Sequence, residues 1–112
     1  MNKIDYNDFE KVELRVGTIT AVDDFPEARI PAYKLTIDLG ENIGVRRSSS
    51  QITDYYKKDD LIGKQVIAVV NFEPKQVGKF MSEVLVTGFY DEVGKVVLIS
   101  PDQVVPNGSK LL

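Results

Sequence analysis

Apolar and polar residues alternate along much of the chain, and a period of two residues predicts β-strands whose two faces differ in burial. In the clearest segment, 33–39, every second residue is apolar and Lys34, Thr36 and Asp38 lie between them. The segment 65–72 is apolar on both faces, which predicts a strand in the interior of a sheet. By the same criteria we expect further strands at 12–16, 43–50, 83–90 and 95–100.

The apolar phase of the first strand changes near Gly17. Leu14 and Val16 share one parity, whereas Ile19 and Ala21 share the other. A glycine at such a phase change predicts a β-bulge or a sharp bend, which lets a strand turn the corner of a barrel.

Two short helical pieces are expected in addition to the strands. Asp5 is a suitable N-cap, and Tyr6 and Phe9 lie three residues apart on one helix face, so we expect a short helix that ends near Lys11. Thr53 is expected to cap a single helical turn.

The number and length of these elements predict the fold class. The proline- and glycine-containing segments 24–31 and 73–81 are expected to be loops. The chain has 112 residues, the size of one domain, so we expect a single domain over 1–112. Five or six short strands around a bend favour an all-β, partly open five-stranded barrel of the oligonucleotide-binding (OB) type, with an SH3-like barrel as the main alternative.

The composition lowers the expectation of catalysis. The chain contains no cysteine and no histidine, and therefore lacks thiol nucleophiles, disulfides and the usual general base near neutral pH. We found no phosphate-binding loop and no nucleophile elbow. We therefore expect a binding protein with no enzymatic activity, no cofactor and no bound metal.

Charge and hydropathy indicate where such a protein works. The net charge is −3, but residues 29–79 carry nine basic and six acidic side chains, so any contact with nucleic acid would use a local patch. No apolar stretch approaches the roughly 20 residues that span a bilayer, and no signal peptide is evident. We expect a cytoplasmic protein that is not inserted in a membrane.

Two segments combine charge with groups suited to binding. In 46–51, Arg46 and Arg47 precede three serines and a glutamine, which together supply forked and adaptable hydrogen-bond donors. The alternative is an exposed polar strand, and alternation turns the two arginines to opposite faces. The second segment is 73–81, where Lys75 and Lys79 lie near Phe80.

Aromatic side chains could serve as stacking platforms for a ligand. The candidates are Tyr55, Tyr56, Phe72 and Phe80. For Phe72 we favour packing in the core.

Several motifs, taken in order, resemble the tRNA-binding domain family. These are LRVGTI at 14–19, LTIDLG at 35–40, VVNFEPK at 69–75 and SEVLV at 82–86. Three further segments are similar to the branch of this family formed by the CsaA export-related chaperones: FPEARIPA at 25–32, SSSQIT at 48–53 and PDQVVPNGSK at 101–110. The resemblance covers nearly the whole chain.

The resemblance implies an OB-type barrel that forms a homodimer, with the terminal segments 1–11 and 101–112 in the interface. It further implies a chaperone in protein secretion that binds unfolded preproteins without nucleotide and also binds the secretion ATPase. The main alternative is a tRNA-binding module. The ligand-binding residues expected from the residue pattern and the resemblance together are Arg46, Arg47, Ser48, Lys75, Lys79, Phe80 and Ser82.

Two departures from the family pattern favour polypeptide over tRNA as the ligand. Members of the family that bind tRNA typically have a Ser-Gly-Leu turn where this chain has SSQI at 49–52, and Ser-x-Gly-Met where it has SEVL at 82–85. With the net negative charge, these changes predict that tRNA binding is weak.

Overall fold

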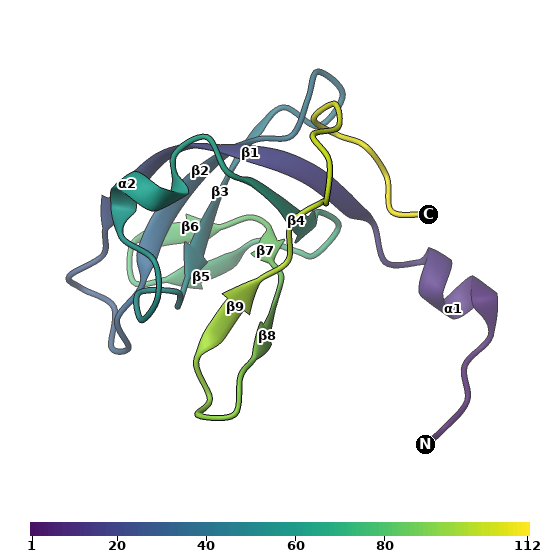
Figure 1. The fold of residues 1–112 in the computed structure, drawn as a ribbon, viewed down its shortest axis with the longest axis horizontal. Coiled ribbons are helices and arrows are strands. Elements are labelled where there is room, and N and C mark those ends of the chain that lie inside the picture. The colour runs from purple at the N-terminus through teal and green to yellow at the C-terminus, as the bar shows by residue number, and fades with distance from the viewer.

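The computed structural model describes all 112 residues and contains a five-stranded antiparallel sheet that curves into a barrel (Figure 1). Its strand order is β3-β2-β1-β4-β7. The strands are β1 (Leu14–Asp24), β2 (Tyr33–Asp38), β3 (Val45–Ser50), β4 (Gln65–Val69) and β7 (Leu85–Val86). The expected fold class, an all-β OB-type barrel with short helices, is confirmed.

Two hairpins complete the fold: β5 (Lys75–Val77) with β6 (Phe80–Ser82), and β8 (Gly88–Tyr90) with β9 (Val96–Leu98). The segment 73–81, expected to be a loop, therefore contains a hairpin, and the single strand expected over 83–90 is divided into β7 and β8. A hydrogen bond joins β3 to the residue after β6, since the Glu83 N–H donates to the Arg47 carbonyl at 2.8 Å.

The main core fills the interior of this barrel. Ile19, Leu35, Ile37 and Leu39 are fully buried there, which matches the apolar alternation of β2. The irregularity of β1 lies between Ile19 and Ala21, so the bulge expected at Gly17 occurs three residues later.

Gly17 has a different role from the one expected of it. An added Cβ at this position would lie 2.6 Å from Cγ2 of Ile37 and 2.7 Å from Cδ2 of Leu39. Glycine is therefore required at this point because the strand backbone passes directly over core side chains.

The two helices lie outside the sheet. The helix α1 (Tyr6–Glu10) begins after the N-cap Asp5, as expected, but has no buried residue and stands away from the barrel (Figure 1). The helix α2 (Lys58–Leu61) begins after the turn expected at Thr53 and buries only Leu61. Neither helix is long and apolar enough to cross a membrane.

The C-terminal tail is fastened to the barrel. The Val16 N–H donates to the Ser109 carbonyl at 3.0 Å, and the Gly108 N–H donates to the Val16 carbonyl at 2.7 Å. The Gln65 side chain bonds both backbone groups of Val105, at 2.7 and 3.1 Å. The tail thus runs beside the first half of β1 and brings the C-terminus to the side from which α1 projects (Figure 1).

Candidate binding surface

Four polar side chains form a regular array on the face of β2 and β3 that points away from the core. Lys34 lies opposite Ser49, and Thr36 lies opposite Arg47 in the strand register. Because the alternating partners such as Leu35 are buried, these four residues occupy the other face. We call Lys34, Thr36, Arg47 and Ser49 the outer patch.

A small aromatic cluster lies beside the outer patch. Phe25, from the connection between β1 and β2, packs edge-on against Phe80 of β6 with ring centroids 5.5 Å apart. Both rings are buried, at 5% and 9% exposure, and pack with Ala32 in a cluster separate from the main core. The cluster therefore joins the β1–β2 connection to the β5–β6 hairpin.

The two cations of the outer patch lie over these rings. The Lys34 Nζ lies 4.9 Å from the Phe25 centroid and 5.8 Å from the Phe80 centroid, and the Arg47 Cζ lies 4.8 Å from the Phe80 centroid. Each contact is a cation–π interaction, which orients the cation and covers the face of the ring.

Carboxylates at the end of β1 pair with some of the nearby cations. Arg47 forms an ion pair with Asp23 at 3.5 Å, and Lys58 forms one with Asp24 at 2.9 Å. The hydrogen bond to Asp24 raises the pKa of Lys58. Asp23 lies opposite Lys34 in the strand register, but the Lys34 side chain forms no ion pair and no hydrogen bond, so its ammonium group is the unpaired cation of the outer patch.

Arg46 and Ser48 lie apart from the outer patch. As alternation predicts, Arg46 points to the opposite face from Arg47, and it approaches Glu83 at 4.0 Å. Ser48 is 1% exposed and its hydroxyl bonds the Ser50 hydroxyl at 3.1 Å. In this structure a ligand on the surface therefore meets Arg47 but does not reach Ser48.

The remaining expected residues belong to the β5–β6 hairpin and its end. The Ser82 hydroxyl accepts the Ser49 N–H at 2.9 Å, which ties β6 to β3. Lys75 and Lys79 are exposed, whereas Phe80 is buried beneath the cations. The expectation that Phe72 packs in the core is wrong, because this side chain is 57% exposed.

Lys34 and Phe25 were not among the residues expected from the sequence. Lys34 was one polar position in an alternating strand, and its pattern alone carries no functional signal. The FPEARIPA segment that resembles the CsaA branch does contain Phe25, so its position could have been singled out from that segment.

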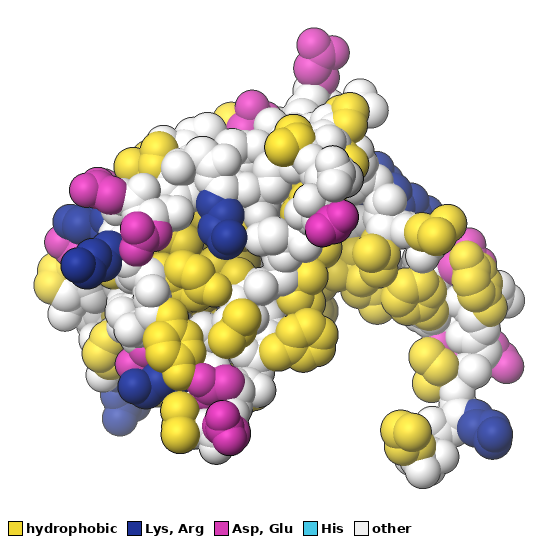
Figure 2. All heavy atoms as spheres, viewed as in Figure 1, with side chains coloured by type: hydrophobic (Ala, Val, Ile, Leu, Met, Phe, Trp, Pro, Cys, Tyr) yellow, Lys and Arg dark blue, Asp and Glu magenta, His cyan; other side chains and the backbone are white.

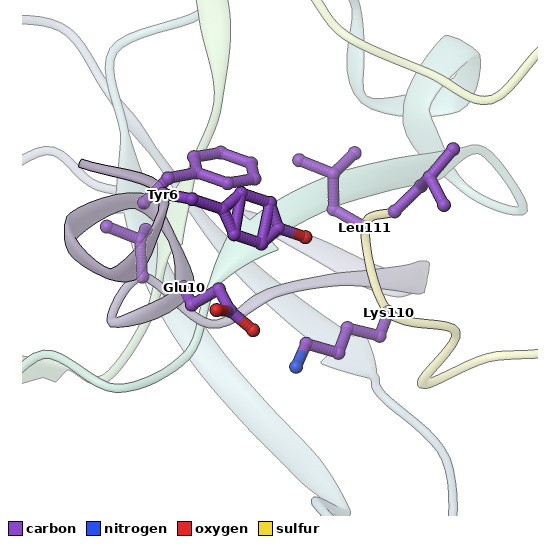
Figure 3. Close-up of a pocket in the computed structure, with 7 residues that line it drawn as sticks. Tyr6, Glu10, Lys110 and Leu111 are labelled. Atoms are coloured by element: carbon purple, nitrogen blue, oxygen red, sulfur yellow. The ribbon is translucent and has the colours of Figure 1, made fainter. Parts of the chain in front are cut away.

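A second exposed surface is formed by the two ends of the chain. Tyr6, Phe9 and Val12 face Leu111 and Leu112. Together with Glu10 and Lys110 they line a pocket of about 190 Å³ (Figure 3). Apolar side chains also gather between α1 and the barrel (Figure 2).

The carboxylates of the chain form no cluster suited to a metal ion. No three acidic side chains lie together in a group that could hold one. The arrangement as a whole supplies cations, hydroxyls and apolar surface, which are the components of a binding surface.

The barrel and the outer patch define a small OB-type binding domain. Residues 14–110 match the model of the family described as putative tRNA binding domain. The chain belongs to this family.

Two solved chaperones are similar over their whole length. The crystal structure of CsaA from Picrophilus torridus is 54% identical, with a TM-score of 0.93, and the match covers 98% of this chain and 100% of that one. The structure of chaperone CsaA from Bacillus anthracis is 49% identical, with a TM-score of 0.93. That match covers 99% of this chain and 100% of the other. The resemblance to CsaA chaperones is thereby confirmed.

Curated relatives include the methionine–tRNA ligase of Methanocaldococcus jannaschii, which is 36% identical over 111 residues, 99% of this chain and 17% of the ligase. The chain thus spans about a sixth of the length of this relative. The match is confined to that segment of the ligase.

Proposed function

We propose that the protein is a dimeric chaperone of the CsaA type that assists protein export by holding unfolded preproteins without nucleotide. The observation that carries this proposal is the identity of 49% and 54% to two chaperones whose whole length the chain covers. The protein works in the cytoplasm and catalyses no reaction. The secretion ATPase is the partner that would receive its clients.

The outer patch supports polypeptide rather than nucleic acid as the ligand. Single-stranded nucleic acid stacks its bases on open aromatic faces. Here the rings of Phe25 and Phe80 are buried, and Lys34 and Arg47 lie over them. Glu83 adds a carboxylate at the edge of β3, where its Oε1 accepts the Arg47 N–H at 3.0 Å.

The termini support a dimer in which residues 1–11 and 101–112 form the interface. A helix of five residues is marginal in water on its own, and α1 buries none of its residues within one copy of the chain. A second copy seated on the pocket between α1 and the tail would bury this apolar surface. Two barrels in one particle would bind one extended client with avidity.

A tRNA-binding module is the second candidate function, and the family match and the methionine–tRNA ligases favour it. It predicts binding that weakens steeply with salt and that falls in Arg47→Ala and Lys79→Ala.

One competition experiment tests both candidates. The purified protein is mixed with an unfolded preprotein and bulk tRNA at physiological salt, and size-exclusion chromatography shows which of them co-elutes. Light scattering of the unfolded client is followed in parallel without nucleotide. We expect the preprotein to co-elute and its aggregation to fall. Selective retention of tRNA with no effect on aggregation of several clients would contradict the chaperone proposal.

A further inference from the structure

The unpaired ammonium group of Lys34 lies at a fixed place on the outer patch. Its Nζ is held against two ring faces, and no carboxylate of the chain lies within ion-pair distance of it. An ammonium group has three donors, and ring faces satisfy its charge only in part. Lys34 is therefore oriented by the protein and still able to bind an anionic group.

The neighbours of Lys34 add donors of the right kind. Arg47 presents a guanidinium group next to it, and the hydroxyls of Thr36 and Ser49 donate to no group of the chain. Directly opposed residues on antiparallel strands place their Cβ atoms about 5 Å apart, so the four side chains converge on one small area. Two cations and two hydroxyls arranged diagonally can surround a single carboxylate.

We infer that the outer patch binds the carboxylate of an acidic residue in an unfolded polypeptide, with Lys34 as the anchoring cation. This assignment rests on the proposed chaperone function and names the feature of the client that the surface selects.

Asp23 acts as an internal competitor in this arrangement. It forms an ion pair with Arg47 at 3.5 Å, and both side chains are largely exposed, at 64% and 41%. An exposed ion pair of this kind is weak. An incoming carboxylate can therefore replace Asp23 on Arg47 while it binds Lys34.

The surroundings favour one carboxylate over a chain of phosphates. Asp23 and Asp24 lie at the end of β1, and Glu83 lies at the edge of β3. A backbone with a charge on every residue would meet all of these carboxylates. A single acidic side chain meets Asp23, which lies opposite Lys34 in the strand register, and can avoid the other two.

Two labelled peptides of identical length test the inference. Both consist of leucine, serine and glycine, with two glutamates at the centre of one and two glutamines at the centre of the other. Fluorescence anisotropy measures their binding to the full chain at physiological salt. We expect the glutamate peptide to bind more tightly, and Lys34→Gln to weaken it about tenfold while leaving the glutamine peptide unchanged.

The control variant is Lys58→Gln, which removes the same charge from a lysine that Asp24 already pairs. It should leave the affinity for the glutamate peptide unchanged, and Lys34→Arg should restore most of the affinity lost in Lys34→Gln. Asp23→Asn should tighten the same peptide about threefold, because it frees Arg47.

Three results would overturn the assignment. The first is equal affinity of the wild type for the two peptides, and the second is an equal effect of Lys34→Gln and Lys58→Gln. The third is displacement of the glutamate peptide by oligouridine RNA that depends on Lys34, which would assign the surface to phosphate.

If the wild type suppresses client aggregation and Lys34→Gln binds both peptides normally, only this inference fails. If Lys34 governs peptide binding but no client is protected, only the chaperone proposal fails.

Discussion

At the scale of single residues, Gly17 shows how little room the barrel leaves where β1 crosses the core. The absent side chain lets the strand lie directly on Ile37 and Leu39. The neighbouring atoms belong to fully buried side chains, so they have little freedom to move aside.

Gly17→Ala should therefore destabilise the protein by overpacking, by about 1–3 kcal/mol. Thr20→Ala, at an exposed position of the same strand, serves as the control and should cost less. Urea denaturation followed by circular dichroism measures both values. An alanine variant as stable as the wild type would show that the core side chains repack without cost.

Single residues also show where prediction from the sequence ended. The buried positions of β2 followed from alternation, because a half-buried strand has one apolar face. The pairing of Lys34 with Phe25 and Phe80 did not follow, since it joins three separate segments of the chain. A contact of this kind depends on tertiary packing and leaves no local pattern.

At the scale of elements, two consecutive tyrosines brace the β8–β9 hairpin. The Tyr56 hydroxyl accepts the Leu98 N–H at 3.0 Å near the base of the hairpin. The Tyr55 hydroxyl donates to the Asp91 carboxylate in the turn, and the Lys95 Nζ lies 5.6 Å from the Tyr55 ring centroid. The loop before α2 therefore sets the direction in which the hairpin projects.

The pKa of Asp91 should show whether the hydrogen bond from Tyr55 is present. The hydrogen bond from Tyr55 lowers the pKa of Asp91, with help from the N–H groups of Lys95 and Val93. The pKa of Asp91 is therefore lower in the folded than in the unfolded protein. The contribution of the Asp91 carboxylate to stability is present above the unfolded pKa and is lost as the pH falls through the folded pKa. Tyr55→Phe should raise the pKa of Asp91 towards its ordinary value.

Carbon-detected NMR of the Asp91 carboxyl group across acidic pH measures this change. The matched control is Tyr6→Phe, at an exposed tyrosine of α1, which should leave the pKa of Asp91 unchanged. An Asp91 titration unchanged by Tyr55→Phe would mean that the hydroxyl does not hold the carboxylate in solution.

The elements differ in how well the sequence predicted them. The strands β1, β2 and β4 were predicted because each places apolar residues on the core, whereas the buried residues of β3 are Ser48 and Ser50. The β5–β6 hairpin was missed because β5 has only three residues, none of them buried, and lies between Pro74 and Gly78. Its position depends on the packing of Phe80 against Phe25, which a search for alternation does not detect.

At the scale of the whole molecule, the arm formed by α1 should decide the oligomeric state. Phe9→Ser removes apolar surface from the pocket between α1 and the C-terminal tail. If this pocket is the dimer interface, the variant should shift the protein towards monomer, with a dissociation constant raised at least about tenfold.

Analytical ultracentrifugation over a range of concentrations measures the shift. Val93→Ser alters an exposed valine between β8 and β9, outside that pocket and outside both terminal segments, and should leave the dimer intact. A Phe9→Ser variant that dimerises like the wild type would place the interface elsewhere, and a monomeric wild type would remove the basis for avidity.

The separation of the aromatic cluster from the main core has a consequence for how this fold diversifies. Phe25, Ala32 and Phe80 pack with one another and not with the ten residues that fill the barrel. Substitutions at the outer patch and in this cluster therefore change no side chain of the main core, and effects on stability are closest to additive where two sites share no partner. A lineage can exchange the preferred ligand while retaining the same scaffold, and a protein engineer can randomise this surface on the same grounds.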